Sequence, residues 1–376
     1  MTTELRSIAL PILLIGALIG LVVATLGGLS FESPAPVERL TIERFVLEPG
    51  MITAHVRNTG PTPLTIAQVS VNDSIWPATA SPSNEIPRLG TATVTLRFPW
   101  VQGEAYDVVF FTANALAFSG TIPVAFETPR PTLSMLGSFT LIGLYVGVLP
   151  IGIGLLWLPA LRRAGQRGMV FLLGFTVGVL VILGIDTLSE AVEQATRVPG
   201  PFQGLVLVGI GVLGTVLILA TVAARETHGF RLAYLIALGI GLHNLAEGLA
   251  IGAAYSVGEF ALGMFLIVGF ILQNVTEGVA LVVPVLRERV KVLHLLVLGL
   301  VAGAPTIAGT WIGGFNASVV LATLFLAIGA GAIAQVLYAV SRLALRETQR
   351  VGTPTVGLAG VVSGMLLLYV TGLILK

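Results

Sequence analysis

Long apolar runs separated by short polar segments make up most of the chain. Nine of these runs contain about 20 or more mostly apolar residues, the length that crosses a bilayer core of about 30 Å. They cover residues 7–29, 134–158, 169–188, 202–224, 232–257, 260–286, 292–314, 317–341 and 355–375. The pattern predicts a polytopic α-helical membrane protein in which one helix is separated along the chain from a group of eight.

The separating segment, residues 31–128, has a different pattern. Short stretches such as MITAHVRN, LTIAQVSVN and TATVTLRF alternate polar and apolar residues at period two, with turn signals such as NTGPTP between them. Several short strands in such a segment predict a small β-sandwich, similar to an immunoglobulin domain. His55 is its only histidine, and we expect a structural position for it. Nothing in the segment identifies a partner.

Three parts follow from these patterns. Residues 1–30 form an N-terminal membrane anchor or signal, and the apolar run exceeds the 7–15 residues of a secretory signal core, which favours an uncleaved anchor. Residues 31–128 form the β-sandwich domain, and residues 129–376 form the eight-span domain. The segment TPRPTL connects the last two parts as a stiff linker.

Composition narrows the function classes. The chain is 55% hydrophobic and only 10% charged, which excludes an ordinary soluble protein. It has no cysteine, so disulfides, thiolate metal sites and cysteine nucleophiles are excluded. Its basic residues are spread over short loops, which gives no indication of a nucleic-acid partner.

The distribution of basic residues predicts an orientation in the cell membrane. Lys and Arg concentrate in cytoplasmic loops. Loops on one side of the eight spans carry Arg162, Arg163, Arg167, Arg225, Arg231, Arg287, Arg289, Lys291, Arg342, Arg346 and Arg350. Loops on the other side carry only Arg197. We therefore expect the N-terminus inside, and the β domain and C-terminus outside.

Two copies of one polar motif interrupt neighbouring apolar runs. HNLAEGLA begins at His243 and QNVTEGVA begins at Gln273, so the copies are 30 residues apart. In each copy the first residue and the glutamate are four positions apart, which places them on one face of a helix. Only a few residues around Gly258 and Glu259 join the two runs. The helices must therefore be adjacent and antiparallel, and the two motifs meet near the middle of the membrane.

This placement puts ionisable groups where they are costly. An ionisable side chain at the bilayer centre costs on the order of 3 kcal/mol, and two facing carboxylates also repel. A divalent cation compensates for both effects, and imidazole, carboxylate and amide ligands suit Zn, Fe, Mn, Co or Ni better than Cu(I). We predict a metal site formed by His243, Glu247, Gln273 and Glu277, with Asn244 and Asn274 available to a weaker neighbouring position.

Three other interpretations stay open. A buried polar clamp could simply join the two helices, although a clamp needs one polar pair and the motifs supply six polar side chains. An intramembrane metalloenzyme would need an open metal position and a general base, commonly as HExxH, which the chain lacks. A metal sensor or receptor could bind metal in the membrane and act through the β domain.

At these motifs the chain resembles the ZIP (Zrt/Irt-like) metal-ion transporters, most closely the GufA-type branch, whose fourth and fifth spans carry patterns close to HNxPEGLA and QNxPEGLA. The resemblance covers residues 134–376. It implies a transporter rather than an enzyme, which moves a divalent transition metal, Zn above Fe, Mn, Co, Ni or Cd, into the cytoplasm. It also implies a homodimer, no resident cofactor, and an elevator-like movement of spans one, four, five and six against the others.

The chain departs from the family pattern in places. The proline common before each motif glutamate is replaced by Ala246 and Thr276, and Ala304-Pro305 stands where many relatives have Glu-Pro. A second metal position would lose a carboxylate there, so we expect one good site.

Four further polar residues lie outside the two motifs. The second core span ends IDTLSEAVEQ, where Asp186 and Glu190 are four apart and could attract cations at the outer mouth. His228 lies in a cytoplasmic loop, and His294 lies near a cytoplasmic span end. We expect His228 to be solvent-exposed rather than a ligand.

Overall fold

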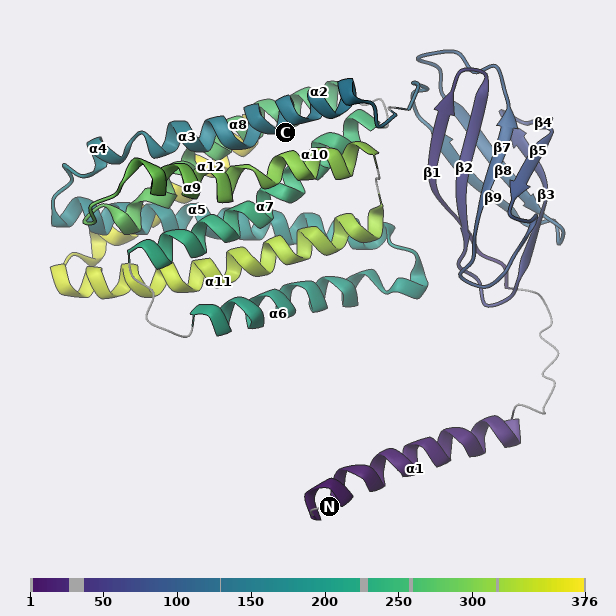
Figure 1. Cartoon of the computed structure of the whole chain (residues 1–376), viewed down its shortest axis with the longest axis horizontal. Coiled ribbons are helices and arrows are strands. Elements are labelled where there is room, and N and C mark those ends of the chain that lie inside the picture. Colours follow the sequence, from purple (N-terminus) through teal and green to yellow (C-terminus); the bar gives the residue numbers. More distant parts are fainter. Residues whose placement is uncertain are drawn as a thin grey trace.

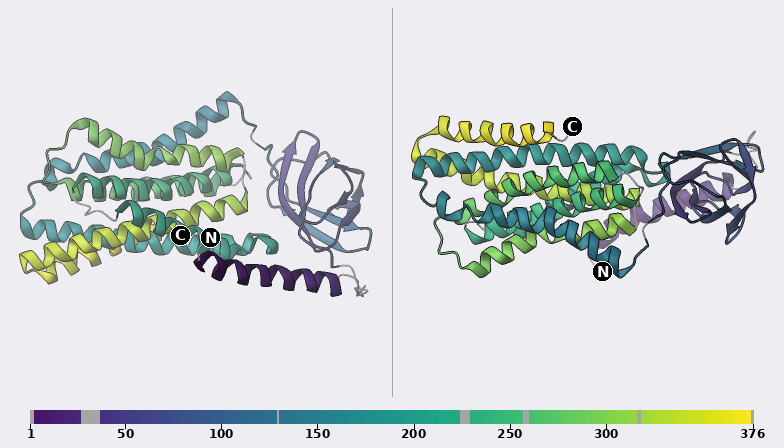
Figure 2. Two further views of the ribbon diagram at one scale, coloured as in Figure 1. Left: turned by 60° about the horizontal axis from the view of Figure 1, so that its bottom comes forward. Right: turned by 90° about the horizontal axis from the view of Figure 1, so that it is seen from above.

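The computed structural model describes residues 3–26, 37–128, 130–223, 229–256, 260–315 and 318–374. Helices α2 to α12 run side by side as a bundle, and the strands form a separate β unit at one end of it (Figures 1 and 2). Helix α1 (Thr3–Leu26) precedes the β unit. His228, Gly258 and Glu259 lie outside the described residues.

The β unit consists of two antiparallel sheets, ordered β1-β2-β7-β5 and β4-β3-β8-β9, with β6 paired to β3. Alternation in the sequence produces the shared core, because Ile52, Ala54 and Val56 on β2 all point inward and the residues between them do not. The strands are β1 (Leu40–Glu48), β2 (Met51–Asn58), β3 (Leu64–Val71), β4 (Ser74–Trp76), β5 (Ala78–Ser81), β6 (Glu85–Ile86), β7 (Thr91–Arg97), β8 (Tyr106–Thr112) and β9 (Ala117–Ile122).

Within the described residues, seven helical segments are long and apolar enough to cross a membrane. They are Leu133–Leu161, Gln166–Arg197, Gly200–Thr221, Phe230–Ser256, Leu262–Val285, Val292–Phe315 and Val319–Val351. Shorter apolar stretches lie in α1, at Leu13–Val22, and in α12 (Pro354–Ile374), at Pro354–Val370. The molecule is therefore compatible with a polytopic membrane protein.

Two predicted helix ends were wrong. Helix α5 (Gln166–Arg197) continues past residue 188, so Asp186 and Glu190 lie within it and not at its end. Helix α11 (Val319–Val351) continues past residue 341 and includes Arg342, Arg346 and Arg350, which were expected in a loop. An apolar run shows only which part of a helix suits the membrane. The helix can continue beyond that run where the following residues are polar but favour helices, such as Glu, Gln and Arg.

Two other predicted spans are interrupted. The first consists of α2 (Leu133–Gly143), a π-turn η1 (Leu144–Val148), α3 (Leu149–Leu155) and α4 (Leu158–Leu161). The sixth consists of α9 (Val292–Gly303) and α10 (Pro305–Phe315), which are separated at Ala304. Pro305 explains that break, because proline has no N–H to donate and is well placed at the first position of a helix.

The remaining helical elements are continuous. They are η2 (Gly200–Phe202), α6 (Gly204–Ala223), α7 (Phe230–Ser256), α8 (Phe260–Val282) and η3 (Val283–Val285). Of the seven candidate spans α7 is the most enclosed: 78% of its apolar window is buried, against 22–56% for the others. A helix that is enclosed on all sides lies at the centre of its bundle. The first polar motif is therefore surrounded by protein.

Candidate metal site

The two polar motifs lie near the middle of α7 and α8 and meet inside the bundle. His243, Glu247 and Glu277 are only 5%, 4% and 0% exposed. Each offers one ligand atom, and these atoms all lie within 4.8 Å of one another. Atoms that share one Zn-like ion at about 2.0–2.2 Å lie at most roughly 4.4 Å apart. A small inward movement of these side chains therefore suffices to enclose an ion.

Gln273 completes this cluster. Its amide nitrogen lies 2.7 Å from Glu247 Oε1, 3.2 Å from Glu277 Oε1 and 3.1 Å from His243 Nε2. An amide nitrogen carries two hydrogens, so it cannot satisfy three acceptors at once. The cluster contains more acceptors than hydrogens, which favours a cation at this point. Rotation of the amide would turn its oxygen towards the same point as a further ligand.

Thr187 determines which nitrogen of His243 faces the cluster. The Thr187 hydroxyl donates to the Leu183 carbonyl at 2.7 Å, and so it accepts from His243 Nδ1 at 2.9 Å. With Nδ1 carrying the hydrogen, the neutral imidazole presents an unprotonated Nε2, 3.3 Å from Glu247 Oε1. Such a second partner fixes the orientation of a ligating histidine. The sequence analysis missed Thr187, because no spacing rule relates it to a residue 56 positions away.

The two asparagines use their amide hydrogens on irregular backbone. Asn274 donates to the Val146 carbonyl in the π-turn at 2.9 Å and to Glu247 Oε2 at 3.1 Å. Asn244 donates to the Ala302 carbonyl at 3.1 Å, beside the break between α9 and α10. Both Oδ1 atoms are buried and have no hydrogen-bond partner among the described residues. Oxygen acceptors are thus available beside the cluster.

Two more buried oxygens, Glu277 Oε2 and Thr306 Oγ1, also have no hydrogen-bond partner within the described residues. Thr306 lies two residues after Ala304, the position at which many relatives of the predicted family carry a glutamate. The Thr306 hydroxyl is therefore a polar group of α10 close to that position in the chain. Buried oxygens without partners are costly unless an ion or water occupies the site. The predicted weaker neighbouring position at Asn244 and Asn274 stays a prediction.

The other predicted polar residues lie elsewhere. Asp186 and Glu190 are both exposed; Glu190 lines a cavity between the helices and the β unit, and Asp186 does not contribute to its wall. His294 packs on the Phe230 ring at 4.8 Å between ring centres. His55 lies on β2 within the β unit, where burial and then the Arg44 charge lower its pKa. None of these four residues adds a ligand atom to the cluster.

Comparisons with known proteins do not help to interpret the site. No protein-family model matches the chain, and no curated protein matches it. The geometry of the described side chains is therefore the basis for a function.

Proposed function

We propose that this protein is a ZIP-like transporter that moves a divalent transition-metal cation, Zn above Fe, Mn, Co, Ni or Cd, across the cytoplasmic membrane into the cytoplasm. In this proposal eight spans form the transport domain, and α1 anchors the chain ahead of the β unit. The observation that supports it is the buried convergence of His243, Glu247 and Glu277, with more acceptors than hydrogens around Gln273.

The ion is cargo, and the chain supplies its temporary ligands. Glu247 and Glu277 contribute the negative charge that compensates for the lost hydration of a divalent ion. His243 Nε2 contributes the nitrogen ligand that separates borderline transition metals from Ca²⁺ and Mg²⁺, which prefer oxygen alone. Gln273 exchanges a hydrogen-bonding nitrogen for a ligating oxygen as the ion arrives.

Glycine contacts support a movement of two helix groups. Some glycines of the described helices lie so close to another helix that an added Cβ would come within 3.0 Å of its backbone. These close contacts divide the helices into two groups, because each one joins two members of the same group. The first group contains α2–α4 and α7–α10, joined for example at Gly154 and Gly309; the second contains α5, α6, α11 and α12, joined for example at Gly178 and Gly331. Such close packing ties the helices within each group to one another.

The division has a consequence for the metal site. The ligands on α7 and α8 belong to the first group, while Thr187 on α5 belongs to the second. The Thr187–His243 hydrogen bond therefore crosses the boundary, and a slide of the groups would break it. His243 would lose its orienting partner in the other arrangement, which would lower metal affinity and favour release.

Metal uptake by the purified protein in liposomes tests the proposal. We expect uptake of at least one ion from a panel of Zn, Fe, Mn, Co, Ni and Cd, and its loss in Glu247→Ala. Glu85→Gln is the control, because Glu85 lies exposed on β6 of the β unit and outside the polar motifs. Metal binding without uptake would contradict transport and favour a sensor that acts through the β unit.

A further inference from the structure

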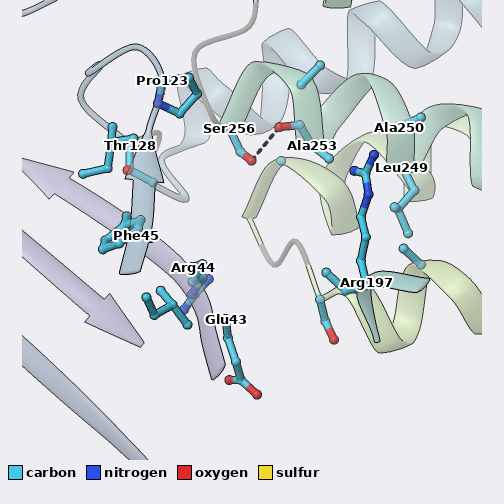
Figure 3. A pocket seen from close by; sticks show the side chains of 18 of the residues that line it. Glu43, Arg44, Phe45, Pro123, Thr128, Arg197, Leu249, Ala250, Ala253 and Ser256 are labelled. Carbon is cyan, nitrogen blue, oxygen red and sulfur yellow. Dashed lines mark hydrogen bonds between the residues drawn. The ribbon is translucent and has the colours of Figure 1, made fainter. Parts of the chain in front are cut away.

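A cavity of about 750 Å³ lies between the β unit and the adjacent end of the helical bundle (Figure 3). One wall comes from β1 and the chain after β9, and includes Glu43, Arg44 and Phe45. The opposite wall comes from α5, α7, α8, α10 and α11, and includes Arg197 and Ala253. Neither part of the protein encloses this space alone.

The cavity extends along α7 towards the metal site. Ala246, Leu249, Ala250 and Ala253 all line it, and their spacing places them on one face of the helix. Ala246 directly precedes Glu247, so the cavity reaches the first residue beside a predicted ligand. From Ala253 to Ala246 the helix rises about 10 Å. The space therefore forms a passage towards the site and not only a surface hollow.

The walls carry two acidic and two basic side chains, Glu43, Glu190, Arg44 and Arg197, so the place of each charge matters more than their sum. Glu43 is paired with Arg57, and Arg197 is paired with Glu193. Glu190 on the helical wall makes no ion pair with any described residue, and it lies one helical turn from Thr187. Glu190 is the charged residue of the α5 wall nearest to Thr187, and its carboxylate attracts cations towards that end of the passage, whereas Arg44 lies on the β wall.

Contacts of the β unit fix the chain that leads to α2 and reach the turn between α5 and α6. Leu47 and Thr128 exchange two hydrogen bonds of 2.9 Å, which tie the chain leading to α2 onto β1. Arg130 and Glu48 form an ion pair of 3.0 Å beside them. Further along, the Arg57 guanidinium lies 5.6 Å from the centre of the Phe202 ring, in the turn between α5 and α6.

We infer that the β unit is the roof of a vestibule through which the transported cation reaches its site. This inference rests on the proposed function and assigns a part in it to the β unit. The vestibule admits a hydrated divalent ion, whose six waters occupy roughly 180 Å³ at about 30 Å³ each. It also has room for a small chelate, but not for a metal-carrying protein.

Thiol labelling tests this arrangement without relying on transport, and the cysteine-free chain suits it. In full-length Ala250→Cys, a small cationic methanethiosulfonate should react, while a maleimide on a long polyethylene glycol should react about tenfold or more slowly than at the exposed control Ser74→Cys. Equal reaction of the bulky reagent at both positions would overturn the roof. Absence of reaction with the small reagent would overturn the passage. Ala322→Cys, on the α11 wall, provides a second position if Ala250→Cys does not fold.

The contact between Arg57 and Phe202 allows the position of the β unit to be perturbed by one substitution. Phe202→Leu removes the cation–π contact with Arg57, and should speed bulky labelling at Ala250→Cys about two- to fivefold, the effect of one exposed cation–π contact. Unchanged labelling would show that this contact does not hold the roof.

Uptake supplies the last comparison. In protein that transports, labelling Ala250→Cys with the small reagent should stop uptake but leave labelled Ser74→Cys active. Continued uptake through the labelled vestibule would overturn this route for the ion. If the unmodified protein transports nothing, the proposed function fails, while the labelling result still decides whether the β unit covers the passage.

Discussion

Replacing Thr187 by valine tests how the site is built, because the two side chains differ mainly by the hydroxyl. Thr187 is 1% exposed, and its oxygen lies 2.9 Å from His243 Nδ1. Without it, a buried N–H of His243 loses its partner, which costs about 1–3 kcal/mol. Loss of such a partner typically weakens metal binding about 10–100-fold, or roughly 1.4–2.7 kcal/mol. The first cost lowers the stability of the fold and the second lowers metal affinity, so we expect a 10–100-fold rise in the metal Kd of Thr187→Val.

The assay is equilibrium competition between the purified protein and a chelating dye for the metal that the native chain carries. Thr176→Val is a matched control, because Thr176 is also buried on α5 and its hydroxyl bonds only the Leu172 carbonyl, at 3.0 Å. Thr187→Ser keeps the hydroxyl and should restore most of the affinity. The reasoning fails if Thr187→Val binds as well as Thr176→Val, or if Thr187→Ser binds as weakly as Thr187→Val.

Three further predictions follow from the same contacts. Glu247→Gln keeps the shape of the side chain but removes one negative charge, and we expect at least about a tenfold loss of metal affinity by calorimetry, since buried charge pairing is worth several kcal/mol. Gly309→Ala would push a methyl group into the Leu245 carbonyl of α7 and should destabilise the protein by about 1–3 kcal/mol in thermal melts, whereas Gly137→Ala, with open space around it, should not. The folded-state pKa of His55 is lowered, so the unfolded state binds a proton more readily than the folded state. The contribution of His55 to the free energy of unfolding is therefore complete above about pH 6.5 and declines as the pH falls towards the folded-state pKa. Thermal melts of His55→Asn should lose this pH dependence.

The amino-acid sequence determined the parts of this protein that depend on near neighbours. Apolar run length predicted the helices, and period-two alternation predicted strands such as β2. The four-residue spacing within each motif, and the short connection between them, predicted that His243 and Glu277 would meet. These results follow because the periods of helices and strands, and the antiparallel packing of closely connected helices, are local properties.

The tertiary structure decided everything that joins distant segments. Thr187 is 56 residues from His243, and Val146 is 128 residues from Asn274, yet each is in hydrogen-bond contact with its partner. The break at Ala304, which leaves the Ala302 carbonyl beside Asn244, acquires its role only through the neighbouring helix. The cavity beneath the β unit likewise exists only because two separate parts of the chain pack side by side. Such contacts depend on which helix faces satisfy one another in the whole bundle, and no local pattern records that choice.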